Sequence, residues 1–325
     1  MPFTVTLPDE EELEAERNFR TYKNYLHSLN LIVENTYGRE SLYKNLKQSV
    51  SKQIIISSKR ATNIKIDIIK KLLFNSWCTE IVLNLPNDFD PSLKFYSNLW
   101  APVQAYYSIY LALRALIEAK CIQCREDHTT TLSLIASWIR KGDFSLLPWS
   151  VYCKGCVEYE NHKYYNLPNG YETSKISPMT NPSKENMWDF YCLMLRTTRK
   201  KLLARRKIEW KREKNRKRMR RDQIFDLDRD IHPTTFFDNM YRLRIRSNYQ
   251  DADAFMMGTQ TLNDAANYHS VLTGITKATL FIIEMYICML LGQGAFKKVV
   301  YDFIKRDRTE QSDKSIKSRV EFFDI

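Results

Sequence analysis

Residues 233–255, PTTFFDNMYRLRIRSNYQDADAF, contain the helix around which the predicted fold is organised. Thr234 and Thr235 can cap its start, and Asp238 lies in its first turn, where the helix dipole favours a carboxylate. Because an α-helix turns roughly 100° per residue, five side chains lie in a narrow stripe along one side of this helix, which we expect to face the core. They are Phe236, Met240, Leu243, Ser247 and Ala254.

Three arginines within five residues, Arg242, Arg244 and Arg246, lie on the flanks of this stripe. Like charges at this density repel one another, so an acidic or anionic group is expected beside them. Two interpretations remain open. Asp251, Asp253 and carboxylates of neighbouring helices neutralise the arginines, or the arginines face an anionic ligand.

The second half of this stretch, LRIRSNYQDADAF, resembles the second signature helix of HEPN-domain proteins (higher eukaryote and prokaryote nucleotide-binding). Residues 104–117, QAYYSIYLALRALI, resemble the tyrosine-rich helix that packs beside it in that family. The resemblance covers about half of the chain. It implies an all-α, up-and-down helical bundle, commonly dimeric. In this setting Tyr107 and Arg114 would border the active groove, although an ion pair with Glu118 also accounts for Arg114.

In the family that these motifs resemble, many members are metal-independent ribonucleases that use an arginine, a short spacer and a histidine. Here four residues separate Arg244 from Tyr249 and six separate Arg242 from Tyr249, so a tyrosine stands where the histidine would be. The resemblance implies site residues Arg244, Tyr249, Arg246, Asn248 and Arg242. It also implies a homodimer, a role as a toxin or antiphage effector, and a cognate antitoxin or sensor protein as a further partner.

The composition favours a folded protein with a polyanionic partner. The chain has 325 residues, 44% hydrophobic and 13% aromatic residues, and a formal charge of +12. This balance points to RNA or another nucleic acid. We expect a cytoplasmic protein without a membrane segment, because the longest apolar run, residues 278–291, is short and contains Glu284.

We expect an N-terminal helical region at 1–98, a HEPN-like bundle at 99–305 and a charged C-terminal tail at 306–325, of which Phe322 and Phe323 can dock. Helices are expected at about 8–34, 39–50, 63–84, 99–119, 131–141, 261–291 and 296–303. Residues 142–186 form a loop-rich insert within the bundle. Loops of this length without periodicity are usually functional, metal-bound or disordered.

One long basic helix is predicted at about 187–223. Between residues 199 and 221 the chain has fourteen Lys or Arg against Glu209 and Glu213. A solvated helix face is the simplest interpretation of such a run, and phosphate binding without base readout is the functional one. The candidate nucleic-acid-binding residues are Arg199, Lys200, Lys201, Arg205, Arg206, Arg212, Arg216 and Arg220.

Cys121, Cys124, Cys153 and Cys156 form two CxxC pairs separated by twenty-eight residues. Four thiolates at this spacing can hold a structural Zn²⁺, which would fasten the insert and take no part in chemistry. The alternative is four unrelated cysteines. No cofactor is expected for catalysis.

Metal-independent RNA cleavage needs a base, an acid and cations for the phosphorane. The arginines supply the cations, and Tyr249 suits an acid better than a base. Four histidines are candidate bases, with His232 nearest in sequence to the arginine helix: His128, His162, His232 and His269. Three functions remain: a ribonuclease, a non-catalytic nucleic-acid-binding module, and a nucleotide-sensing domain in which Arg244 and Arg246 hold a phosphate.

Overall fold

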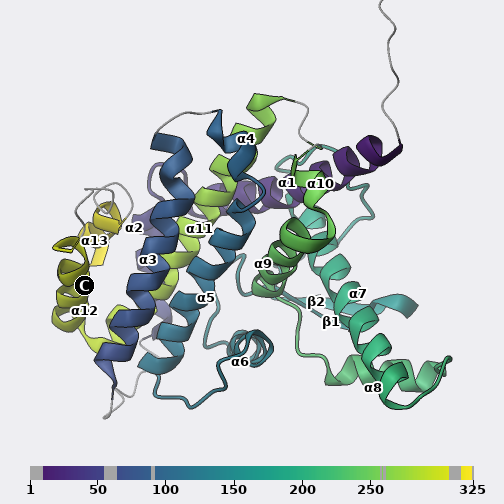
Figure 1. Cartoon of the computed structure of the whole chain (residues 1–325). Coiled ribbons are helices and arrows are strands. Elements are labelled where there is room, and N and C mark those ends of the chain that lie inside the picture. The colour runs from purple at the N-terminus through teal and green to yellow at the C-terminus, as the bar shows by residue number, and fades with distance from the viewer. Residues whose placement is uncertain are drawn as a thin grey trace, which may run out of the picture.

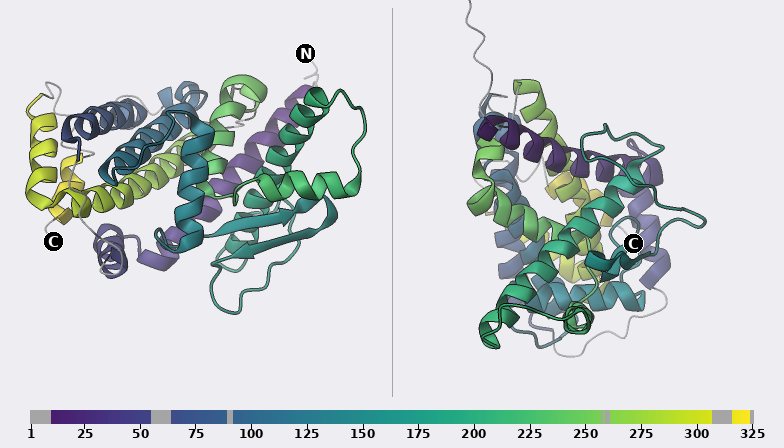
Figure 2. Two further views of the ribbon diagram at one scale, coloured as in Figure 1. Left: turned by 90° about the horizontal axis from the view of Figure 1, so that it is seen from below. Right: turned by 90° about the vertical axis from the view of Figure 1, so that its right-hand side faces the viewer.

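A computed structural model describes residues 10–54, 64–88, 92–256, 258, 261–306 and 316–323. Within these ranges the chain is almost entirely helical, with one two-stranded sheet. This confirms the expected all-α class. Figure 1 shows the long helices packed along one another, with the sheet to one side. Figure 2 shows an elongated body with the sheet and the C-terminal helices towards opposite ends.

The core is built on α3 (Ile66–Asp88), α5 (Ala101–Ala119) and α11 (Leu262–Leu291), which lie side by side in Figure 1. Small residues of α5, among them fully buried Ala105 and Ala112, permit the close approach of its neighbours. Where α3 meets α5, the Ser76 hydroxyl donates to the Ser108 carbonyl (2.8 Å) and the Ser108 hydroxyl to the Ser76 carbonyl (3.0 Å). These reciprocal bonds satisfy polar groups in an apolar contact.

Three further helices enclose this core: α1 (Glu10–Tyr37), α2 (Leu42–Ile54) and α4 (Leu93–Ser97). Buried residues of α1, α3 and α5 belong to one hydrophobic cluster, so the boundary expected at residue 98 does not separate two cores. By length and composition α11 could cross a membrane, but 78% of its most apolar window is buried inside the protein. The Thr261 side chain caps its start and Gly292 follows its end.

The C-terminal segment is part of the core. After α12 (Gln293–Ile304), residues 316–323 form the short turns α13 (Ser318–Val320) and η4 (Glu321–Phe323). Fully buried Arg319 binds the carboxylates of Glu80 and Glu284, and the Trp77 indole also donates to Glu284 (2.7 Å). Phe323 is buried, as the sequence suggested. Residues 307–315 and 324–325 of the expected tail lie outside the described residues.

The insert contains a β-hairpin that the sequence analysis did not predict. Strands β1 (Tyr152–Cys156) and β2 (Asn161–Tyr165) pair antiparallel, with Cys153 opposite Tyr164. Cys153 also pairs with Thr234 through two backbone hydrogen bonds of 2.9 Å, so the hairpin is fastened to the start of the arginine helix. Gly155 has a φ of 98°, and a Cβ there would meet the Asn161 carbonyl oxygen at 2.3 Å. The insert is therefore partly a small sheet.

The prediction of a single long helix at 187–223 is wrong, because two helices cover this range. α7 (Met187–Glu213) ends before Asn215, which has a φ of 49°, and α8 (Arg221–Asp230) begins after a turn. Asparagine tolerates this left-handed conformation better than most residues, which explains the helix end. Leu203 of α7 packs with Ile224 of α8, so α8 folds back against α7.

The arginine helix is also interrupted. α9 (Phe236–Ile245) begins with a capping box between Thr235 and Asp238, as expected. A π-helical turn at Arg246–Gln250 then precedes α10 (Ala252–Met256), in place of one continuous helix to Phe255. The predicted core stripe is confirmed: Phe236, Met240, Leu243, Ser247 and Ala254 are all buried. Such π turns insert one residue and often occur at functional positions.

Candidate nucleic-acid interface

A cleft lies between α6 (His128–Lys141), α7 and α9. It consists of two adjoining hollows of about 760 and 510 Å³. Both hollows share the side chains of Leu202, Arg205 and Glu209 from α7 and of Asp238 and Tyr241 from α9. The predicted arginine helix and the predicted basic helix thus face the same cavity, which the sequence alone did not reveal.

The lining of the cleft is predominantly basic. Its cations are Lys201, Arg205, Arg206, Arg212, Arg242 and Arg246, and its carboxylates are Glu209, Asp230 and Asp238. Burial lowers the pKa of Lys201, and repulsion from Arg246 and Arg242 lowers it further. A bound anion would relieve this repulsion.

Arg242 reaches from α9 to α7 without meeting a carboxylate. Its Nη1 donates to the hydroxyls of Thr197 (2.9 Å) and Thr198 (3.2 Å), while its Nε is buried without a hydrogen-bond partner. Burial lowers the pKa of the guanidinium. An arginine in this setting is a cation whose hydrogen-bonding capacity is only partly used.

Arg244 is held by aromatic rings. Its Nη2 donates to the Tyr107 hydroxyl (2.9 Å), and the guanidinium carbon lies 5.1 Å from the Tyr107 ring centroid and 5.8 Å from that of Tyr241. The Nε is buried and unpartnered. Among the described residues no carboxylate forms an ion pair with Arg242 or Arg244. The expected proximity of Tyr107 to the arginine helix is confirmed.

Arg246, in contrast, is neutralised. Its Nη1 binds both carboxylate oxygens of Asp251, at 2.8 and 3.0 Å. The Tyr22 hydroxyl of α1 donates to the same carboxylate. The π turn places Arg246 and Asp251 in contact. Neutralisation by a carboxylate of the protein therefore accounts for Arg246. For Arg242 and Arg244, contact with an anionic ligand stays open.

Two predicted catalytic residues lie outside the cleft. Tyr249 is 70% exposed, and neither it nor Asn248 is among the residues that line the cavity. Both follow Ile245, where the α-helical hydrogen-bond pattern changes to the π turn. The expected pairing of Arg244 with Tyr249 has no contact to support it in the described chain, since Arg244 turns to Tyr107.

The basic residues of α7 and of the turn after it divide into two groups. Most of the predicted nucleic-acid-binding side chains are exposed: Lys200, Lys201, Arg205, Arg206, Arg212, Arg216 and Arg220. Arg205 and Arg206 share Glu209 through 3.0 Å ion pairs, and the Glu209 hydrogen bond raises the pKa of Arg205.

Arg199 is a correction. It is fully buried and forms a 2.8 Å ion pair with Asp228. Its guanidinium also donates to the carbonyls of Gly155 (2.8 Å), His232 (3.1 Å) and Asp228 (3.1 Å). These contacts join α7 to the hairpin, α8 and the start of α9. Arg199 has a structural role and is inaccessible to a nucleic acid.

Two histidines lie at the site. His232 lines the cleft and binds Asp238 through Nε2 (2.7 Å). Burial acts to lower the pKa of His232, but the charge and hydrogen bond of Asp238 together raise it above its usual value.

His128 was a weaker candidate in sequence, yet it contacts the same rings as Arg244. Its ring lies 5.9 Å from Tyr107 and 5.2 Å from Tyr241, and Nδ1 is 2.7 Å from the Tyr106 hydroxyl. Burial, and then the charge of Arg244, lower the pKa of His128. At neutral pH its imidazole is therefore uncharged, as a general base requires.

The two CxxC pairs predicted as zinc ligands are not gathered into one cluster in the described structure. In the described ranges no group of three or more His, Cys, Asp or Glu side chains is arranged to hold a metal ion. Cys153 is buried in the main hydrophobic cluster and Cys156 in the smaller cluster between α7 and α8, whereas Cys121 is exposed. Burial raises the pKa of the Cys153 thiol to about 12. The zinc site stays a prediction from the sequence.

No model of a protein family matches this sequence, and no curated protein or solved structure is significantly similar to it. The resemblance to HEPN domains therefore rests on the two sequence motifs. What the site can do is argued below from its own residues.

Proposed function

We propose that this protein binds single-stranded RNA in the cleft between α7 and α9. The supporting observation is that Arg242, which lines the cleft, and Arg244, two residues further along α9, bind hydroxyl groups and form no ion pair with a carboxylate in the described chain. Lys201 and Arg212 add positive charge to the same cleft. Phosphate oxygens accept the hydrogen bonds that such arginines have available.

The exposed cations beyond Glu213 extend this surface. Arg216 and Arg220 lie in the turn between α7 and α8 and are solvent-exposed. In the proposal the turn contacts the phosphate backbone outside the cleft, which contributes affinity without base specificity. The HEPN fold, the homodimer and the cognate antitoxin or sensor protein belong to the same proposal.

Cleavage of the bound RNA without a metal ion is the second part of the proposal, supported by His128. In the tautomer whose Nδ1–H donates to the Tyr106 hydroxyl oxygen, Nε2 is free to take a proton from a ribose 2′-hydroxyl. The 2′-oxygen then attacks the phosphorus, the bond from phosphorus to the 5′-oxygen breaks, and the leaving 5′-oxygen takes a proton from solvent water. Arg244, which contacts the same two tyrosines, stabilises the charge that develops on the phosphorane. His128 replaces Tyr249 as the preferred acid–base residue because His128 contacts the same two tyrosine rings as Arg244, whereas Tyr249 has no such contact in the described chain.

Labelled single-stranded RNA incubated with the protein in excess chelator tests both parts. We expect cleavage to fall by about 100-fold or more in His128→Gln and binding to weaken in Arg244→Gln. The same substitution at His162, which lies on the hairpin, is the matched control and should change neither.

Uncut RNA with intact binding would refute cleavage and leave the binding module. No binding by the wild-type protein would refute the whole proposal. Cleavage lost in Tyr249→Phe but kept in His128→Gln would return the acid–base role to the tyrosine.

A further inference from the structure

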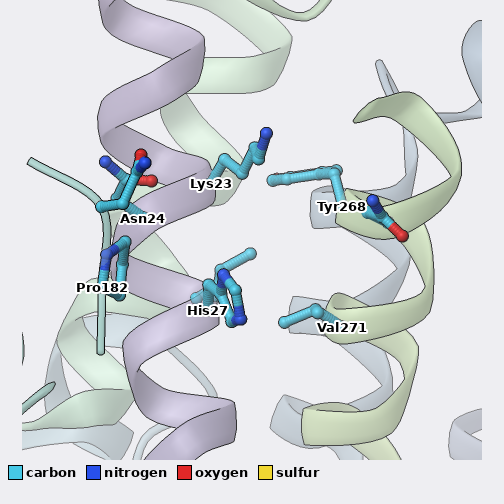
Figure 3. Close-up of a pocket in the computed structure, with 9 residues that line it drawn as sticks. Lys23, Asn24, His27, Pro182, Tyr268 and Val271 are labelled. Atoms are coloured by element: carbon cyan, nitrogen blue, oxygen red, sulfur yellow. The ribbon is translucent and has the colours of Figure 1, made fainter. Parts of the chain in front are cut away.

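A second hollow, of about 450 Å³, lies between α1, α11 and the loop that precedes α7. Figure 3 shows Lys23, Asn24 and His27 on α1, Pro182 on the loop, and Tyr268 and Val271 on α11 around it. None of these residues lines the cleft between α7 and α9. Its volume is within the usual range for a small-molecule pocket.

Among the described residues, Lys23 is the only Lys, Arg, Asp or Glu that lines this hollow, and its charge is compensated by Asp264, which lies outside the lining. The Lys23 ammonium is 2.5 Å from the Asp264 carboxylate, and this hydrogen bond lowers the pKa of Asp264. His27 is uncharged at neutral pH because burial, followed by repulsion from Lys23, lowers its pKa. An ionic ligand would find no uncompensated partner here, so the ligand class is neutral.

Hydrogen-bonding groups surround the hollow. Asn267 presents an exposed amide, and His27 presents a neutral imidazole. The Asn181 amide oxygen accepts a hydrogen bond from Nη2 of Arg20 (3.3 Å), so its amide nitrogen is the group that can donate to a ligand. Tyr268 extends from α11 towards α1 and is 1% exposed, yet its hydroxyl has no hydrogen-bond partner. This hydroxyl is closed off from solvent, and the Tyr268 ring packs against Phe19 and Phe255, so the hydrogen bonds available to a ligand come from Asn181, Asn267 and His27.

The pocket is held in shape by Asn24. This buried residue donates through Nδ2 to the carbonyls of Pro178 (2.8 Å) and Thr180 (2.9 Å), which fixes the loop against α1. The walls between the polar groups are apolar and come from Leu26, Pro182 and Val271. The site therefore combines apolar surfaces with separated donors and acceptors.

A flat heterocycle with polar edges and apolar faces matches this combination. Asparagine amides pair with the edge of a purine through adjacent donor and acceptor atoms. We propose that the pocket between α1 and α11 binds an uncharged nucleoside through its base, with Asn267 and Asn181 on the base edge. This proposal does not depend on RNA binding in the other cleft.

Calorimetric titration of the full chain with adenosine, guanosine, cytidine and uridine tests this site. We expect at least one nucleoside to bind at one molecule per chain. Asn267→Ala should weaken its binding about tenfold, the effect of one lost hydrogen bond. Asn263→Ala is the matched control, because Asn263 lies one turn earlier on α11 outside the pocket, and it should leave affinity unchanged.

Val271→Trp fills the hollow and should abolish binding while a thermal melt confirms that the variant is folded. No binding of any of the four nucleosides would overturn the proposal, as would equal binding by wild type, Asn267→Ala and a folded Val271→Trp. The matching 5′-monophosphate should bind no more tightly than the nucleoside. A tenfold gain from the phosphate would overturn the neutral ligand class.

Neutralising Lys201 and Arg212 in the RNA cleft distinguishes nucleoside binding at α1 and α11 from nucleoside binding in the RNA cleft. The double variant Lys201→Gln/Arg212→Gln should bind the nucleoside like the wild-type protein. Loss of nucleoside binding in that variant would place the nucleoside in the RNA cleft and overturn the assignment to α1 and α11.

Discussion

The salt dependence of RNA binding can be worked out from the cleft. Six cations line it and three carboxylates offset them, so between three and six phosphate contacts are available. On a single strand each contact contributes roughly −0.7 to the slope of log K against log salt concentration, which gives a slope between roughly −2 and −4. A fourfold rise in salt should therefore weaken binding between roughly 20-fold and 300-fold.

The double variant Lys201→Gln/Arg212→Gln removes two cations of the cleft, for which the described chain shows no ion pair. The slope should become shallower by about 1.4, because two contacts of about 0.7 each are lost. Fluorescence anisotropy with labelled single-stranded RNA, repeated at several salt concentrations, measures this change.

Lys298→Gln/Lys305→Gln is the matched control, since both lysines are exposed on or beside α12, away from the cleft. The wild-type slope should persist in this control. An unchanged slope in the cleft variant, or an equal change in both variants, would refute binding between α7 and α9.

Three stability predictions follow. Burial lowers the pKa of His269 from 6.5 to about 4, so between these pH values the imidazole is neutral in the native protein and protonated in the unfolded chain. The free energy of unfolding should therefore be highest above pH 6.5 and fall by about 3 kcal/mol towards pH 4. Urea unfolding of His269→Leu should lack this pH-dependent loss. Arg319→Met should cost about 3–5 kcal/mol because two buried carboxylates lose their partner, and a loss below about 1 kcal/mol in urea unfolding at pH 7 would contradict the ion cluster. Gly258→Ala places a Cβ 2.5 Å from the Ala15 carbonyl oxygen and should lower the melting temperature, whereas Gly274→Ala, where a Cβ meets no atom within 4 Å, should not.

Periodicity and caps were enough to predict most helices. The start of α11 at its Thr261 cap and its end at Gly292 followed from local chemistry. The same reasoning did not predict the end of α7 within 187–223, because a run of strong helix formers contains no stop signal except Asn215. The left-handed backbone of Asn215 was not anticipated from the sequence. The hairpin was missed because its turn uses Glu160 at a φ of 53°, where glycine or asparagine would have been the recognisable signal.

The site was predicted in part. Arg242 and Arg244 of α9 and Arg246 of the π turn are two residues apart, so each points in a different direction and meets a different neighbour. The neighbours are threonines of α7 for Arg242, a tyrosine of α5 for Arg244, and Asp251, which follows the π turn, for Arg246. The burial of Arg199 was not predictable, because most of its acceptors are backbone carbonyls of distant segments.

The ion cluster of Arg319 has a consequence for biosynthesis. A nascent chain that has been translated through α11 already contains Glu80 and Glu284, but the guanidinium that neutralises them is still inside the ribosome. Until it emerges, closing α3 against α11 would desolvate two carboxylates without a counter-charge. The helical core is therefore expected to close only after residue 319 has emerged from the ribosome.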